Sequence, residues 1–195
     1  LMRARGRVAR LPALGIICIG RGNDFAFGAG VPADLAEGCR TLAEGYRRPM
    51  DVGRIVGGDY PQGRYFGNGI GVGFDTIVGL EAAKMKHVRG FMAYVLGALR
   101  TLFLYYRAPL LRVERDGATA ELRSIQISVM NGRRMGGAFF MAPEAVNDDG
   151  LLDLCMADAP RRLAMLGLMT RYMKGSQAES PHISTARLRG IGITA

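Results

Sequence analysis

The first apolar run of the chain is short, continuous and rich in β-branched residues. It covers residues 14–19 and leads directly into the segment Gly20-Arg-Gly-Asn-Asp24. Such a run is typical of a strand that is buried on both faces. Pro32 begins a stretch whose apolar residues share one helical face: Leu35, Cys39 and Leu42. Residues 14–45 are therefore predicted to form a strand, a glycine loop and a helix.

From residue 49 onward, short segments with strand-like patterns replace this arrangement. Residues 51–56 and 64–74 are joined by the turn-rich residues 57–63. Two later segments flank Asp116-Gly117, which is a strong hairpin signal. Strands are predicted over residues 51–56, 64–74, 110–115, 119–130, 136–142, 151–157 and 183–194.

Two further stretches have helical spacing, residues 76–106 with a break near Arg89-Gly90, and residues 161–174. In the second stretch we expect Leu163, Leu166 and Met169 to point inward. The apolar run that begins at Phe91 is interrupted by Arg100 and is too short to span a bilayer. For its aromatic side chains, packing in the core is favoured over a lipid-binding groove: Tyr94, Phe103, Tyr105 and Tyr106.

These patterns predict an α+β fold with two parts. Residues 1–48 are expected to be the tail of an α/β nucleotide-binding domain, of which they supply the last strand–helix unit after an arginine-rich start. Residues 49–195 are expected to form a mainly antiparallel β-sandwich domain with inserted helices. Because the patterns stop inside predicted elements at both ends, we expect the chain to be a fragment, truncated at its C-terminus.

The composition adds a strong positive charge. Lys and Arg exceed Asp and Glu by 26 to 17, which gives a net charge of +9, and 23 of the 26 basic residues are arginine. Arginine suits phosphate and carboxylate partners, but a general compositional bias toward arginine would give the same excess, and both explanations stay open. Three widely spaced cysteines and two histidines exclude a disulfide framework and a multi-histidine metal centre, and favour a reducing compartment.

The segment Gly20–Asp24 is the first candidate site. A buried strand that ends in a glycine loop before a helix is the usual geometry for ligand binding in α/β sheets. The glycines allow backbone amides to approach an anion, and Arg21 can bind a phosphate. Asn23 and Asp24 would fix the loop by capping, or bind a ribose hydroxyl or a metal. A simple capped turn explains the same residues, so the motif alone leaves both interpretations open.

The second candidate is the acidic turn of residues 143–153, with Asn147, Asp148 and Asp149 ahead of a glycine. Hard cations prefer carboxylate and carbonyl oxygens, and this turn supplies both. Its spacing excludes an EF-hand. An acidic turn before a strand, without an ion, is the alternative.

Taken in order, several segments resemble the diacylglycerol kinase catalytic family, the bacterial lipid kinases that are related to sphingosine kinases. The first, residues 15–26, resembles the family pattern Gly-Thr-Gly-Asn-Asp-Phe-Ala, with Arg21 in the place of the threonine. The others are Met50-Asp-Val-Gly53, Phe66–Asp75, Val129-Met-Asn-Gly132, Gly136-Gly137 and Pro143–Asp153.

This resemblance implies an enzyme that transfers the γ-phosphoryl group of Mg·ATP to a lipid hydroxyl. It places the nucleotide on Gly20, Arg21, Gly22, Asn23 and Asp24, although Arg21 puts the family's hydroxyl contact in doubt. It also places a structural Mg²⁺ on the carboxylate of Asp149 and the carbonyls of Val146 and Leu151. The implied cofactors are ATP and Mg²⁺. The implied partner is a membrane lipid at an anionic surface, which would make the protein cytoplasmic and peripheral to the inner face of the membrane.

The chain departs from the family at two places. The Gly-Gly-Asp-Gly-Thr phosphate loop would precede Leu1, and the late Asp-Gly-Glu, which carries the general base, would follow Ala195. No catalytic residue is therefore assigned, and we expect these 195 residues to be inactive by themselves. Nucleic acid is not expected as a partner, and a homodimer is open. The alternative function is a non-catalytic β-sandwich module that binds acidic lipid or a protein; an enzyme of the NAD kinase type fits the motifs less well.

Overall fold

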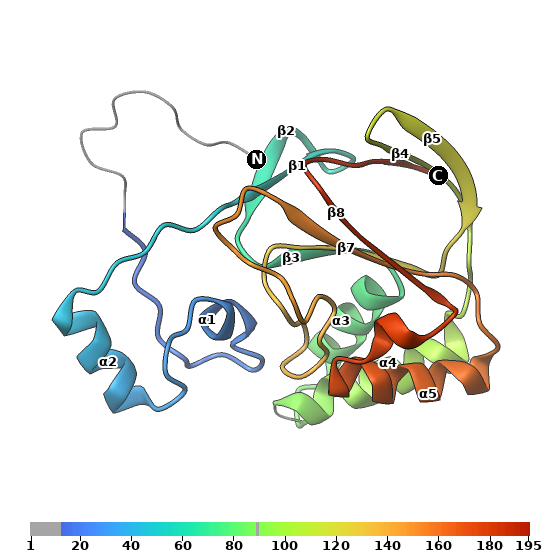
Figure 1. Ribbon diagram of the computed structural model, residues 1–195. Helices are drawn as coiled ribbons and strands as arrows, with labels where there is room; N and C mark the ends of the chain where they lie inside the picture. The colour runs from blue at the N-terminus through green and yellow to red at the C-terminus, as the bar shows by residue number, and fades with distance from the viewer. Residues whose placement is uncertain (1–12, 89) are drawn as a thin grey trace.

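The computed structural model describes residues 13–88 and 90–195, so the arginine-rich start of the chain lies outside it (Figure 1). In the described residues, every strand pairing is antiparallel, and the strands form three sheets. The two-stranded sheet consists of β1 (Gly53–Gly57) and β2 (Tyr60–Phe66). The four-stranded sheet has the order β3 (Gly69–Gly73), β6 (Gln126–Met130), β7 (Leu152–Ala157) and β8 (Ile183–Leu188). The three-stranded sheet has the order β5 (Ala118–Arg123), β4 (Leu110–Arg115) and β9 (Gly192–Thr194). The helices are α1 (Asp24–Gly28), α2 (Leu35–Glu44), α3 (Phe74–Lys84), α4 (Phe91–Leu104) and α5 (Arg162–Lys174), with a 3-10 turn at Gln177–Glu179.

The four-stranded sheet is the middle layer of the molecule. One face packs on the three-stranded sheet through an apolar cluster that includes Val113, Ile127 and Leu154. Helices α3, α4 and α5 lie against the other face, where a second cluster includes Leu102 and Met165 (Figure 1). Strands β6 and β7 are buried along their whole length because they are covered on both sides. The predicted α+β fold with an antiparallel sandwich is confirmed.

The predicted buried strand at residues 14–19 is wrong for this structure. The segment is extended, but it pairs with no strand in the described part of the chain, and Leu14 and Ile19 are 75% and 82% exposed. A continuous apolar run becomes a buried strand only when neighbouring strands and covering layers surround it. Here the segment lies beside α2, where Gly15 faces the side chain of Leu42.

Helix α2 forms where it was predicted. Asp34 caps it by accepting a hydrogen bond from the Glu37 amide at 2.9 Å, and Gly45 ends it in the left-handed conformation with φ 72°. However, Leu35 and Leu42 remain 53% and 40% exposed, so the apolar face of α2 is largely uncovered.

Five further expectations need correction. The strand predicted at 64–74 is two strands, β2 and β3. Those at 119–130 and 183–194 divide into β5 and β6 and into β8 and β9, and in each case the two strands belong to different sheets. Residues 136–142 form a loop with one bridge between Met135 and Phe139. On α5, Leu163 is 81% exposed, because the stripe facing the sheet is Met165, Leu168, Met169 and Tyr172. Among the described helices, none is long and apolar enough to cross a membrane.

Helices α3 and α4 approach closely at Gly97. A Cβ atom there would lie 2.9 Å from the Val78 carbonyl oxygen and 3.1 Å from the Ala82 nitrogen. We therefore expect Gly97→Ala to lower the free energy of unfolding by about 1–2 kcal/mol, since the added methyl group forces the helices apart. Urea denaturation measures the change.

The matched control is Gly167→Ala on α5, where a Cβ atom would meet nothing within 4 Å. This variant should gain roughly 0.5–1 kcal/mol from improved helix propensity. Equal effects of the two substitutions would show that the contact at Gly97 is not tight.

Candidate functional site

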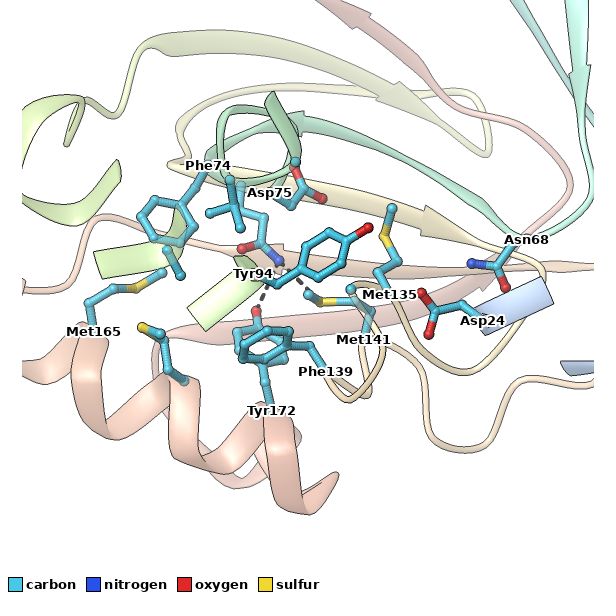
Figure 2. Close-up of a pocket in the computed structure, with 16 residues that line it drawn as sticks. Asp24, Asn68, Phe74, Asp75, Tyr94, Met135, Phe139, Met141, Met165 and Tyr172 are labelled. Atoms are coloured by element: carbon cyan, nitrogen blue, oxygen red, sulfur yellow. Dashed lines mark hydrogen bonds between the residues drawn. The ribbon is translucent and has the colours of Figure 1, made fainter. Parts of the chain in front are cut away.

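A cavity of about 300 Å³ lies between the four-stranded sheet and the helices that cover it (Figure 2). Its walls are mostly apolar and include four methionines, whose flexible side chains adapt to irregular ligands. Helices α3, α4 and α5 contribute Val78, Ala98 and Met165, and the loop after β6 contributes Phe139. The cavity can accept an apolar chain.

The polar groups of the cavity are few and lie at defined positions. Figure 2 shows Asp24 and Asn68 at one end, far from Met165 at the other. Asn68 is fixed because its Nδ2 donates to the Arg134 carbonyl at 3.0 Å. Its Oδ1 is buried and has no hydrogen-bond partner within the described structure. This oxygen lies against Gly132, where a Cβ atom would be only 2.2 Å from it.

Asp75 is the second carboxyl group of the cavity. Ser128 Oγ donates to its Oδ2 at 2.6 Å, and the Thr76 amide donates to its Oδ1 at 2.8 Å. Burial nevertheless raises the pKa of Asp75 to about 6, because desolvation of the carboxylate outweighs these hydrogen bonds. Gln126 extends the network by donating from Nε2 to Ser128 Oγ at 3.1 Å and to the Tyr172 hydroxyl at 3.3 Å.

The glycine loop, residues 20–24, borders the polar end of the cavity. Asn23 adopts the left-handed conformation, φ 52°, and its Oδ1 accepts the Gly20 amide at 2.8 Å. Asp24 begins α1, and its carboxylate oxygens accept the Gly137 amide at 3.0 and 3.1 Å. Thus the side chains of Asn23 and Asp24 hold the loop in shape, but neither caps α1, because its N-cap residue Asn23 makes no side-chain cap hydrogen bond.

Asp24 is also paired with Arg134, whose Nε lies 3.1 Å from Oδ1. Burial raises the pKa of Asp24, while the Gly137 amide and the Arg134 guanidinium oppose that rise. The same guanidinium lies over the Phe27 ring, 3.8 Å from its centroid. A Cβ atom on Gly22 would lie 3.1 Å from the Gly137 nitrogen, so the two loops meet with little spare room.

Arg21 points toward helix α3. Its Nη1 donates to the carbonyl oxygen of Ala82 at 3.4 Å, in the last turn of that helix. Arg21, which was expected to bind phosphate, therefore contacts the C-terminal end of α3 in this structure.

The acidic turn lies outside the cavity. Asp149 Oδ1 accepts the Leu151 amide at 2.9 Å, and Oδ2 is 4.0 Å from Arg187 Nη1. Across the turn, the Gly150 amide donates to Asp51 Oδ2 at 2.6 Å. In the described chain, no group of three His, Cys, Asp or Glu side chains could hold a metal. One carboxylate with the carbonyls of Val146 and Leu151 is still a hard-oxygen set that suits a hydrated Mg²⁺.

The sequence interpretation missed several residues of this region. Asp75 and Asn68 lie in the segment 66–75 that carried the resemblance, yet neither was singled out. Arg134 lies in the basic, glycine-rich residues 131–137, for which a simple turn was favoured over an anion site. The core-packing expectation is wrong for Phe103 and Tyr105, which are 61% and 41% exposed. It is confirmed for Tyr94 and Tyr106, which pack against the core, and Tyr94 also lines the cavity.

Known proteins are similar to this chain in sequence and in fold. The family model for the YegS C-terminal NAD kinase beta sandwich-like domain matches residues 68–195, and that for the diacylglycerol kinase catalytic domain matches residues 1–55. A diacylglycerol kinase of Mycobacterium tuberculosis is 31% identical over 182 residues, which cover 92% of this chain and 58% of the relative. A probable lipid kinase YegS-like protein of Xanthomonas oryzae pv. oryzae is 33% identical over 178 residues, covering 87% of this chain and 54% of the relative.

The chain therefore spans somewhat more than half the length of these relatives. A diacylglycerol kinase crystal structure from Bacillus anthracis has a similar fold, with a TM-score of 0.63 and 22% identity over 89% of this chain and 54% of that one.

The raised pKa of Asp75 predicts a pH-dependent stability. An unperturbed Asp has a pKa of 3.8, so between about pH 4 and 6 the folded state keeps a proton that the unfolded state releases. Stability should fall as the pH rises through this window, by about 3 kcal/mol for a shift of this size. In Asp75→Asn this contribution should be lost, so the fall becomes smaller; Asp24 and Asp153, whose pKa values burial also raises, still contribute. Urea midpoints measured from pH 4 to 7 would report it.

The control is Asp59→Asn, which removes an exposed carboxylate from the turn between β1 and β2. It should leave the pH profile of the wild type unchanged. A profile that Asp75→Asn does not alter would show that this carboxyl group is not desolvated.

Proposed function

The chain belongs to the bacterial lipid kinase family that includes the diacylglycerol kinases and the YegS-like lipid kinases, and from this we propose that its cavity binds the lipid that accepts the phosphoryl group. The observation that carries the proposal is the shape of the cavity, an apolar pocket whose polar end borders the glycine loop. The acyl part of a diacylglycerol-like lipid would lie among the methionines. Its hydroxyl group would lie near Asp24 and Asn68.

The Asp24 carboxylate at this end of the cavity supports this orientation, since a lipid hydroxyl is a donor and a carboxylate accepts. Phosphoryl transfer depends on positioning and charge neutralisation more than on covalent help from the protein. The residues of this chain would orient the acceptor and exclude water around it. Bound Mg·ATP would supply the phosphoryl group and the cation that neutralises its charge.

For the nucleotide we propose the glycine loop, with the backbone of Gly20 and Gly22 close to the phosphates and with Arg21, Asn23 and Asp24 beside them. For a structural Mg²⁺ we propose the Asp149 carboxylate with the carbonyls of Val146 and Leu151. Arg187, at 4.0 Å from Asp149, offsets part of the same negative charge.

A membrane surface is the place where such a lipid is available. The outer face of α4 exposes Met92, Leu96 and Phe103 by 54%, 38% and 61%, and the exposed cations Lys86 and Arg100 are close to these residues in sequence. Arg100 is paired with Glu81 at 2.8 Å, so the support comes mainly from the apolar side chains, which suit the interface of a bilayer. The opposite side of α4 lines the cavity with Tyr94 and Ala98. We therefore propose that the protein acts at the inner face of the cytoplasmic membrane.

Filling the cavity tests the acceptor site. Gly79 lines the cavity, and a Cβ atom there would meet nothing within 4 Å, so Gly79→Phe adds a ring without a backbone clash. We expect it to weaken binding of a fluorescent short-chain diacylglycerol about tenfold, the equivalent of burying roughly two fewer methylene groups. Titration of the probe into the chain measures the affinity.

The control is Gly167→Phe, at a helical glycine with equally open surroundings outside the cavity. Equal probe affinities for the two variants would contradict the acceptor site. If the lipid binds but the natural protein transfers no radiolabelled phosphate from ATP, the non-catalytic lipid-binding alternative is favoured.

The ion proposal has its own test. Adding millimolar Mg²⁺ should raise the melting temperature of the chain, and Asp149→Asn, which keeps the shape and removes the charge, should abolish that rise. Asp148→Asn changes the neighbouring exposed carboxylate and should keep the response. If the wild type shows no stabilisation by Mg²⁺, residues 146–151 are only an acidic turn.

A further inference from the structure

The glycine loop contacts both walls of the cavity at its polar end. On one side, Asp24 accepts the Gly137 amide, and the adjacent Gly136 lines the cavity. On the other side, Arg21 reaches the Ala82 carbonyl of α3. The loop thus bridges two parts of the chain that meet around one pocket.

The side that carries Gly137 is held by several contacts. Arg134 pairs with Asp24 at 3.1 Å, donates from Nη2 to the Gly22 carbonyl at 3.4 Å and covers the Phe27 ring. The position of this side is therefore fixed by several contacts, so that the others remain if one of them is lost.

The side formed by α3 depends on fewer contacts with the loop. Ala82 lies one turn after Val78 and Gly79, which line the cavity. The carbonyls in the last turn of a helix lack the next intrahelical donor and carry the negative end of the helix dipole. The Ala82 oxygen also accepts the Met85 amide at 3.2 Å, which leaves a second lone pair for the Arg21 guanidinium.

We infer that Arg21 is a positioning residue for the lipid site, which holds the end of α3 against the glycine loop and so keeps the Val78–Gly79 wall in place. The inference rests on the proposed lipid site and adds a role that does not require contact with the lipid. It also gives Arg21 a function before any nucleotide binds. The loop that we propose for ATP would thereby be connected physically to the acceptor cavity.

The experiment uses the 195-residue chain without nucleotide. Arg21→Ala should weaken binding of the fluorescent short-chain diacylglycerol about two- to fivefold, the range for a cation at an exposed helix C-terminus. It should also speed amide hydrogen exchange in the last turn of α3, with no change in the last turn of α5. Arg40→Ala, which removes an exposed arginine from α2, is the matched control and should change neither measurement.

Arg21→Lys keeps the charge and a donor. Its lipid affinity and its exchange rate in α3 should therefore be close to those of the wild type, even if the alanine variant is less stable. Unchanged lipid affinity and unchanged exchange in Arg21→Ala, with a raised KM for ATP in the natural protein, would overturn the inference and leave Arg21 as a phosphate ligand. If the wild type binds no lipid, the acceptor proposal fails, and faster exchange in α3 would still establish the contact.

Discussion

The burial of β6 and β7 on both faces is the constraint on which the rest of the structure depends. Alternate residues of a strand point to opposite sides, so Ile127 and Val129 face the three-stranded sheet while Gln126, Ser128 and Met130 face the helices. The apolar face closes the sandwich. The other face carries the two polar side chains that form a network with Asp75 and Tyr172, and it is therefore the floor of the cavity.

The parts of the fold that were predictable are those governed by local chemistry. Asp116-Gly117 specifies a hairpin, with both residues at positive φ, and the Asp34 cap with Gly45 specifies the limits of α2. Residues 14–19 and 136–142 have strand-like composition but no strand partner, and pairing is a tertiary property that a single segment does not contain. The inward face of α5 likewise depends on the orientation of the helix against the sheet.

The same distinction between local chemistry and tertiary packing applies to the candidate site. The glycine loop was found because its turn chemistry is local, whereas Asn68 and Asp75 become neighbours of the cavity only after β3 and α3 are packed. Net charge was uninformative for a related reason. Arg21, Arg48, Arg54, Arg133 and Arg134 all donate to backbone carbonyls, so part of the arginine excess stabilises loops.

Asn131 connects three segments that are distant in sequence, and this has a chemical consequence. Its Nδ2 donates to the carbonyls of Asp51 and Gly67 at 2.9 and 2.8 Å, and the amide of Gly132 donates to the Asn68 carbonyl at 2.7 Å. Asn-Gly pairs deamidate when the glycine nitrogen is free to attack the side-chain carbonyl, and here that nitrogen is held elsewhere. Deamidation at Asn131 should therefore be slow in the folded protein and should proceed only through local opening. The combined accumulation of isoaspartate and aspartate at this position during storage would therefore measure how often this part of the molecule opens.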